Sequence, residues 1–244
     1  MLLEKSFEYG EHNGLGLIKG EVCPLENDIE GDLKIPHMGW NALEISNIDD
    51  PIFKYTKQGD YVYFVHSFFA DECENVSVTG KGKIFCSGEN FVEKDDSYYT
   101  PFKRVDKPTP PRVMFFAGCK NVKLLDFNIV NETAGWTFWI HDCDDVSFER
   151  VTIDCDLDYP NNDGIHINCS RNVTVKNCKI SCSDDCIVVR ANSRSLSVNK
   201  TCENVSVSNC TLTSPTSAIR VAFVCDGTIR NCLFSDLSMI DCAV

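Results

Sequence analysis

One short phrase recurs along most of this sequence. Its copies are CENVSVTGKGKI at 73–84, CKNVKLLDFNI at 119–129, CDDVSFERVTI at 143–153, SRNVTVKNCKI at 170–180 and CENVSVSNCTL at 202–212, with a degenerate copy, DGTIRNCLF, at 226–234. Each copy joins a polar turn to a short alternating β-type run, a polar bend and a second apolar pair. Repeats of this length without helical periodicity indicate stacked β-units, so residues 72–244 are predicted to form a β-solenoid.

Cysteine and asparagine occupy fixed places in the repeat. The intervals are 24 residues from Cys119 to Cys143, 32 from Cys178 to Cys210 and 22 from Cys210 to Cys232. The total of 15 cysteines is odd, which favours buried thiols serving as small apolar side chains over a disulfide framework. Asn177, Asn209 and Asn231 are predicted to form a side-chain ladder at one bend. Three cysteines, Cys178, Cys182 and Cys186, do not have the spacing of a zinc knuckle, so no metal is expected.

Residues 1–71 do not share the repeat. They contain GLGLIKGEV, KIPHMGWNALEI and the β-prone run YVYFVHSFF. The composition changes between Phe69 and Cys73, and a boundary is therefore predicted after residue 71, between two parts of different origin.

Charge and segment composition narrow the classes of partner and compartment. The net charge is −13 and no Lys/Arg cluster occurs, so neither nucleic acid nor an anionic membrane is an expected partner. The first residues lack the pattern of a secretory signal, which predicts a cytoplasmic protein as written, or a secreted or periplasmic one if the native N-terminus is missing.

Two acidic clusters carry the candidate chemistry. They are Asn161-Asn162-Asp163-Gly164 and Ser183-Asp184-Asp185-Cys186, and Asp163 precedes Asp184 by 21 residues. That interval is close to one coil of the predicted solenoid, so the three carboxylates should meet on one face. Like charges at short range raise one another's pKa and are costly in a purely structural site. Glycoside hydrolysis needs one protonated carboxyl group and at least one ionised carboxylate.

The stretch that contains both clusters, WTFWIHDC through CIVVRANS, resembles family 28 glycoside hydrolases, the polygalacturonase family. Members of that family typically show NTDG, then GDDC about twenty residues later, then GHG and RIK. The resemblance implies a right-handed parallel β-helix in 72–244. It also implies that Asp184 is the general acid and that Asp163 and Asp185 hold the attacking water of an inverting displacement, without a cofactor.

Four further residues are candidate substrate-binding groups. Asn161 opens the first motif, His166 follows it in the same predicted strand, Arg190 falls where the family often has a lysine, and Arg220 could supply a cation. Trp136, Phe138 and Trp139 could form a sugar-stacking group, although aromatic residues in a solenoid strand more often serve in packing.

The sequence departs from the family pattern in several places. Asn162 replaces the usual threonine and Ser183 the usual glycine, while Thr216-Ser217-Ala218 replaces GHG and no RIK segment is found. Since the missing histidine, arginine and lysine are the groups that suit the family to an acidic sugar, the preference for galacturonate is left open.

Residues 1–71 resemble a fragment of the glutaminase subunit of imidazole glycerol phosphate synthase, a class I glutamine amidotransferase. PHMGWN at 36–41 is the most distinctive phrase. That chemistry needs a cysteine on a strand-to-helix elbow and a histidine oriented by a glutamate. Cys23, His37 and His66 lie in other contexts, so an α/β fragment without its catalytic residues is predicted.

Four hypotheses follow for the whole chain. The leading one is hydrolysis of a pectin-like polysaccharide. The others are a catalytically silent carbohydrate-binding solenoid, a polysaccharide lyase of the same fold, and an amidotransferase subunit of histidine biosynthesis that is inactive as written. A solenoid that ends without a cap exposes strand edges, which predicts self-association through that end.

Overall fold

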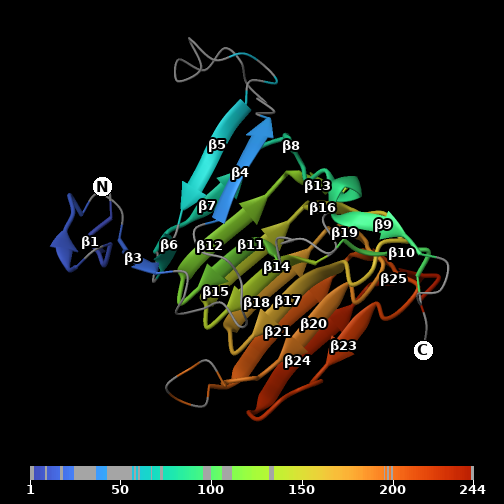
Figure 1. Ribbon diagram of the computed structural model, residues 1–244. Coiled ribbons are helices and arrows are strands. Elements are labelled where there is room, and N and C mark those ends of the chain that lie inside the picture. Colours follow the sequence, from blue (N-terminus) through green and yellow to red (C-terminus); the bar gives the residue numbers. More distant parts are fainter. Residues whose placement is uncertain are drawn as a thin grey trace.

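The computed structural model shows a solenoid of parallel strands with a smaller strand region at its N-terminal side (Figure 1). It describes residues 3–8, 10–16, 19–24, 37–42, 57, 59, 61–66, 68–71, 74–95, 100–105, 112–131, 135–194, 196, 198 and 200–242.

Three parallel sheets form the walls of the solenoid. The sheet that carries the acidic clusters, here the site sheet, contains in spatial order β11 (Arg112–Ala117), β14 (Trp136–His141), β17 (Asp163–Asn168), β20 (Ile187–Arg190) and β23 (Ile219–Val221). A second sheet, here the ladder sheet, contains β7 (Ser77–Thr79), β12 (Lys120–Leu125), β15 (Asp144–Glu149), β18 (Arg171–Lys176), β21 (Cys202–Ser208) and β24 (Ile229–Ser235). The third sheet contains β8 (Lys83–Phe85), β13 (Asn128–Val130), β16 (Thr152–Asp154), β19 (Lys179–Ser181), β22 (Thr211–Thr213) and β25 (Ser238–Ile240).

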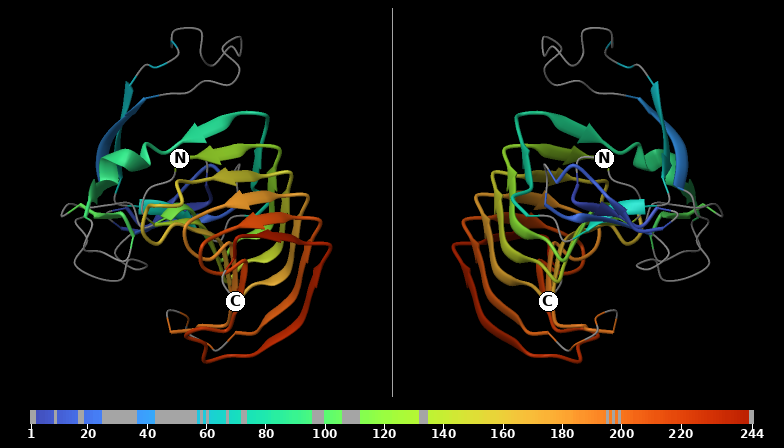
Figure 2. Two further views of the ribbon diagram at one scale, coloured as in Figure 1. Left: turned by 90° about the vertical axis from the view of Figure 1, so that its right-hand side faces the viewer. Right: turned by 90° about the vertical axis from the view of Figure 1, so that its left-hand side faces the viewer.

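Each complete coil gives one strand to each sheet, as in the run β17, β18, β19, and the coils lie one on another (Figure 2). The register places like residues together: Ile165 pairs with Ile187, Val173 with Val205 and Ile180 with Leu212. Their side chains form a single core that runs along the solenoid axis. The sequence period therefore arises from stacking of identical apolar positions, and the predicted right-handed parallel β-helix is confirmed.

Asparagine and aspartate occupy one position at, or just before, the start of each ladder-sheet strand. Residues 75, 121, 145, 172, 204 and 231 all have positive φ, which Asn and Asp tolerate better than other side chains. Asn172 Nδ2 donates to Asp145 Oδ1, and Asn204 Nδ2 donates to Asn172 Oδ1, both at 2.9 Å. Stacked coils thus share a hydrogen-bonded side-chain ladder on this edge.

The sixth repeat copy is shifted from its predicted position. Asn209 bonds to Asn177 as predicted, but Asn231 bonds to Asn204 instead. Cys232 correspondingly pairs with Val205 rather than stacking on Cys210. The dipeptide Asn-Cys occurs at both turns of the repeat, so it does not by itself identify which turn Asn231-Cys232 belongs to. The ladder and the pairing of β21 with β24 determine the actual register.

The cysteines behave mainly as core residues. Cys119, Cys143, Cys155, Cys169, Cys178, Cys182, Cys186, Cys202 and Cys210 all lie in the main apolar cluster. No disulfide is present among the cysteines that the structure describes. The predicted use of thiols as small apolar side chains is therefore confirmed for these positions.

The first part of the chain is described mainly through short strands. β1 (Lys5–Ser6), β2 (His12–Asn13), β3 (Glu21–Pro24) and β6 (Phe68–Asp71) form one sheet, and β4 (His37–Ala42) pairs with β5 (Tyr61–His66). A 3-10 turn, η3 (Gly88–Phe91), leads to the pair β9 (Val92–Lys94) and β10 (Phe102–Arg104). The boundary after residue 71 stays a prediction. None of the helices found within the described ranges has the length and apolar character needed to cross a membrane.

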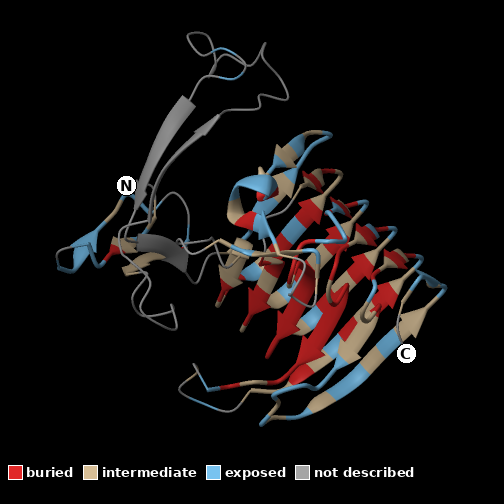
Figure 3. Cartoon of the chain, turned by 45° about the vertical axis from the view of Figure 1, so that its right-hand side comes forward, coloured by how far each residue is buried: buried red, intermediate tan, exposed pale blue. Residues whose placement is uncertain are grey.

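Burial is strongest in the middle coils and weakest in the last one (Figure 3). In β23, β24 and β25 the large side chains of Val221, Leu233, Met239 and Ile240 are exposed. These strands lie at the end of their sheets. Self-association through this surface stays a prediction.

Candidate active site

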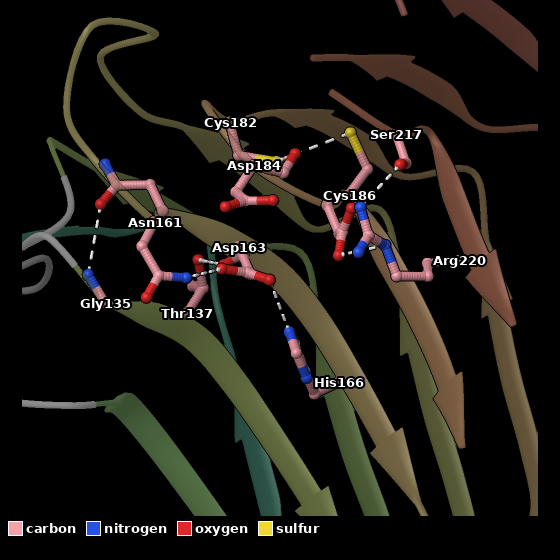
Figure 4. Close-up of polar contacts among 12 residues, drawn as sticks. Gly135, Thr137, Asn161, Asp163, His166, Cys182, Asp184, Cys186, Ser217 and Arg220 are labelled. Atoms are coloured by element: carbon pink, nitrogen blue, oxygen red, sulfur yellow. Dashed lines mark hydrogen bonds and ion pairs between the residues drawn. The ribbon is translucent and has the colours of Figure 1, made fainter. Parts of the chain in front are cut away.

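Two adjacent strands of the site sheet bring the three aspartates together. Asp163 is the first residue of β17, and Asp184 and Asp185 precede β20. Oxygens of the three carboxylates all lie within 4.8 Å of one another. Figure 4 shows the Asp163 and Asp184 side chains directed to a common space. The predicted convergence of the two acidic motifs is thus present in the structure.

Gly164 permits this close approach. A Cβ added at Gly164 would lie 2.3 Å from the Cys186 carbonyl oxygen and 2.9 Å from Ile180 Cγ2. The Gly164 N–H donates to the Asp185 carbonyl at 2.9 Å. The glycine of the first motif is therefore required by coil-to-coil packing at the site, beyond any preference for a turn.

Asp163 is buried and held on both carboxylate oxygens. Asn161 Nδ2 donates to Oδ1 at 2.8 Å, and His166 Nε2 lies 2.8 Å from Oδ2. Arg104 in turn donates to Asn161 Oδ1 at 3.2 Å. Asn161 therefore links Asp163 to a cation on β10. Arg104 carries no sequence signal for this role, because β10 lies outside the repeat.

Asp184 is the least buried member of the cluster. Thr216 Oγ1 donates to its Oδ1 at 3.3 Å, and its backbone N–H donates to the Asn162 carbonyl at 3.0 Å. The Asn162 N–H in turn donates to Ser183 Oγ at 3.2 Å. The two departures from the usual family motifs, Asn162 and Ser183, therefore contact each other across the coils.

Asp185 pairs with Arg220, yet its surroundings disfavour the ionised carboxylate. Arg220 Nε lies 2.8 Å from Asp185 Oδ2 and its guanidinium also donates to Ser217 Oγ. Asp185 Oδ1 is buried and has no hydrogen-bond partner within the described part of the chain. Burial, and then the neighbouring Asp184 charge, raise the pKa of Asp185, while Arg220 opposes that rise.

His166 and Arg190 form a buried contact next to Asp163. They are 2% and 7% exposed, and an Arg190 guanidinium nitrogen lies 2.8 Å from His166 Nδ1. Burial and the positive charges of Arg190, Arg112 and Arg220 lower the pKa of His166 well below its usual value. The imidazole is therefore neutral at pH 7.

The aromatic residues proposed to stack on sugar are largely used in packing. Phe138 is fully buried in the core. The Trp136 ring stacks on His166 at 3.7 Å, and Arg112 lies 3.9 Å from its centroid. Two groups this close to one ring must cover its opposite faces, so Trp136, like Phe138, is used in packing and presents no free face to a sugar. Trp139 is half-buried and stacks on Phe115 at 4.7 Å.

The three carboxylates also have the spacing of a cation site. Within the described ranges, Asp163, Asp184 and Asp185 are the group of potential ligands close enough to share an ion. Carboxylate oxygens would suit a hard divalent cation, although acidic clusters are common without one. The same spacing allows one water molecule to donate a hydrogen bond of about 2.8 Å to each of two carboxylates.

Paired carboxylates are the groups that glycoside hydrolysis uses, and here they lie on a wall of a parallel β-helix. The family model of glycosyl hydrolases family 28 matches residues 51–203, which is more than half of the chain and includes both acidic motifs. The chain belongs to this family.

Curated proteins show a second similarity. Subunit HisH of imidazole glycerol phosphate synthase from Aquifex aeolicus is 44% identical over 90 residues, which cover 36% of this chain and 41% of that protein. The subunit from Wolinella succinogenes is 38% identical over 97 residues, or 39% of this chain and 47% of that protein. The chain thus spans less than half the length of either relative. Cys23 lies within β3 and pairs with Phe69 of β6, a context that differs from a nucleophile elbow.

Proposed function

We propose that this protein hydrolyses an O-glycosidic bond of a pectin-like polysaccharide. The observation that carries the proposal is the set of three carboxylates within 4.8 Å of one another, on the wall of a family 28 β-helix. Their surroundings differ, since Asp163 accepts two hydrogen bonds and Asp184 is the more open group. Glycoside hydrolysis uses such a difference to separate an acid from a base.

In the proposed reaction, Asp184 protonates the leaving glycosidic oxygen as its bond to the anomeric carbon breaks. A water molecule between Asp163 and Asp185 attacks that carbon from the opposite face. Its proton passes to Asp163, whose carboxylate is oriented by Asn161 and His166, while the unpartnered oxygen of Asp185 holds the water through a hydrogen bond. One product fragment carries a new reducing end, formed from the attacked anomeric carbon and the water oxygen. The other carries the hydroxyl group that received the proton from Asp184.

We propose inversion at the anomeric carbon on the basis of the family resemblance. The nearest oxygens lie within 4.8 Å, whereas the two carboxyl groups of inverting enzymes are typically about 6.5–9.5 Å apart. The spacing is nevertheless compatible with one bridging water. Proton NMR of the first product formed measures the outcome directly, and a product that retains the substrate's anomeric configuration would refute the inverting displacement.

The substrate class is tested by reducing-end release from polygalacturonate, rhamnogalacturonan and neutral pectic oligosaccharides. Asp184→Asn should abolish release, since amide replaces the proton donor. Asp154→Asn is the matched control, because Asp154 is an exposed aspartate on β16 of the third sheet. Release that is equal in wild type and Asp184→Asn would contradict the proposal.

Binding without turnover is the second candidate. The ion pair between Arg220 and Asp185 favours it, because it engages one of the carboxylates needed for chemistry. A protein that binds pectic oligosaccharides, releases no reducing ends and keeps its affinity in Asp184→Asn would fit this candidate instead.

A further inference from the structure

A buried chain of polar groups runs from Arg190 through His166 to Asp163. The distances are 2.8 Å from the Arg190 guanidinium to His166 Nδ1 and 2.8 Å from His166 Nε2 to Asp163 Oδ2. The three residues are 7%, 2% and 3% exposed. None of the contacts depends on an exposed side chain, so the chain has one well-defined geometry.

The donor inventory gives this chain a direction. A guanidinium can only donate hydrogen bonds, so Nδ1 of His166 must accept one and carries no proton. A neutral imidazole then has its proton on Nε2, and that proton is donated to Asp163. A buried histidine between an arginine and a carboxylate can satisfy both neighbours only as this tautomer.

Packing also fixes the orientation of the ring. Trp136 stacks on His166 with the ring planes 12° apart, and the Arg190 guanidinium lies 4.7 Å from the Trp136 centroid. A rotated imidazole would lose the stack and both hydrogen bonds. The remaining oxygen of Asp163 is held by Asn161.

We propose that Arg190 and His166 are positioning residues for Asp163, with Arg190 selecting the His166 tautomer that donates to the carboxylate. This inference rests on the proposed hydrolase function and replaces the expectation that both side chains contact sugar. Asp163 is thereby kept as a hydrogen-bond acceptor, and the contact of His166 with its Oδ2 fixes the orientation of the carboxylate toward the attacking water.

The kinetic test compares Arg190→Met with Arg190→Lys. The methionine side chain fills similar space but cannot donate, whereas lysine restores one donor. We expect kcat of Arg190→Met to fall roughly tenfold to a hundredfold, part of the ~10²–10⁴ contribution of a general base, with KM changed less than about twofold. Arg190→Lys should recover part of kcat. A raised KM with unchanged kcat would overturn the proposal in favour of a sugar contact.

Arg171→Met is the matched control. Arg171 lies in β18 of the same coil as β17, but its side chain is 44% exposed and pairs with Asp144 on the ladder sheet. Its kcat and KM should equal those of the wild type. An equal loss of kcat in Arg171→Met and Arg190→Met would show a general effect of removing an arginine and would refute the specific role.

A second measurement does not require activity. Nitrogen-15 NMR of histidine-labelled protein distinguishes the two neutral tautomers, and the spectrum of His166→Gln assigns the His166 signals. We expect the Nε2–H tautomer in wild type and Arg190→Lys, and a shift toward Nδ1–H in Arg190→Met. A wild-type protein with Nδ1–H would overturn the inference even if it hydrolyses pectin. A wild type with Nε2–H and the expected shift, but without hydrolysis, would refute only the proposed function.

Discussion

Strands β17 and β18 follow one another in a single coil, have six residues each, and differ sharply in what surrounds them. In β18, buried valines alternate with partly exposed residues, as expected for a strand with one face toward solvent. Every residue of β17 is buried, including Asp163, His166 and Asn168. The same repeat therefore builds a plain structural wall in the ladder sheet and a buried polar face in the site sheet.

The difference shows how each sheet stabilises its polar groups. In the ladder sheet, the polar groups of neighbouring coils lie at the edge and bond to one another in solvent. In the site sheet, buried polar groups need specific partners, because an unpaired buried charge is destabilising. Such a partner can come from an adjacent strand, as Arg190 of β20 does for His166. Changes to the site sheet should accordingly have larger effects than equal changes to the ladder.

The largest effect is expected from Gly164→Ala, which tests the close approach of β17 and β20. The added methyl group would meet the Cys186 carbonyl at 2.3 Å, and neither strand can move without disturbing the carboxylates. We expect the free energy of unfolding to fall by about 3 kcal/mol or more, the upper range for overpacking. Urea denaturation measures this change. An alanine variant as stable as wild type would show that the strands separate easily.

The next effect concerns acid stability of the site sheet. Burial, together with Arg190 and Lys200, lowers the pKa of His141 from 6.5 to about 4. The unfolded chain therefore takes up the proton first, so this contribution is complete above pH 6.5 and is lost as pH falls toward 4. The loss should reach about 3 kcal/mol.

The measurement is the free energy of unfolding at pH 7 and at pH 4, in wild type and in His141→Gln. Glutamine can still accept the hydrogen bond that Asn168 gives to His141 Nδ1. His166, whose pKa is lowered in the same direction, is present in both proteins and cancels in the difference. Identical pH dependence in the two proteins would contradict a buried, neutral His141.

The smallest effect is expected in the ladder. Asn204→Ala removes hydrogen bonds to Asn172 and Asn231 and places alanine at φ 58°. We expect a loss of about 1–2 kcal/mol, of which the left-handed backbone accounts for a large share. Asn204→Gly keeps the backbone freedom and isolates the hydrogen bonds. If the glycine variant loses as much stability as the alanine variant, the backbone conformation is not the main term.

These two regions were also unequally predictable from the sequence. The apolar period and the paired motifs around Asp163 and Asp184 were sufficient to predict the solenoid and the meeting of the carboxylates. The partners of the site were not predictable in the same way. Arg104 contacts Asn161 and Thr216 contacts Asp184, both from strands or loops distant in sequence. The burial of His166 and Arg190 depends on Trp136 and Arg112. Such contacts depend on strand register and on side-chain direction, which cannot be read from one amino-acid sequence.

The sixth repeat shows the same limit within the structural wall. The dipeptide Asn231-Cys232 fits the sequence of either turn of the repeat. Only its contacts with Asn204 and Val205 show which turn it occupies. A degenerate copy has too few apolar positions to fix its own register. Repeat periods are therefore secure where several copies agree, and uncertain at the last coil.

The central claim is that the three carboxylates act as one catalytic unit, and a double-mutant cycle tests it most directly. The kcat for reducing-end release is measured for Asp163→Asn, Asp184→Asn and the variant carrying both changes. Because acid and base serve the same transition state, the double variant should lose about as much activity as the more damaged single variant. Losses that multiply would show that Asp163 and Asp184 contribute independently, and would contradict the account.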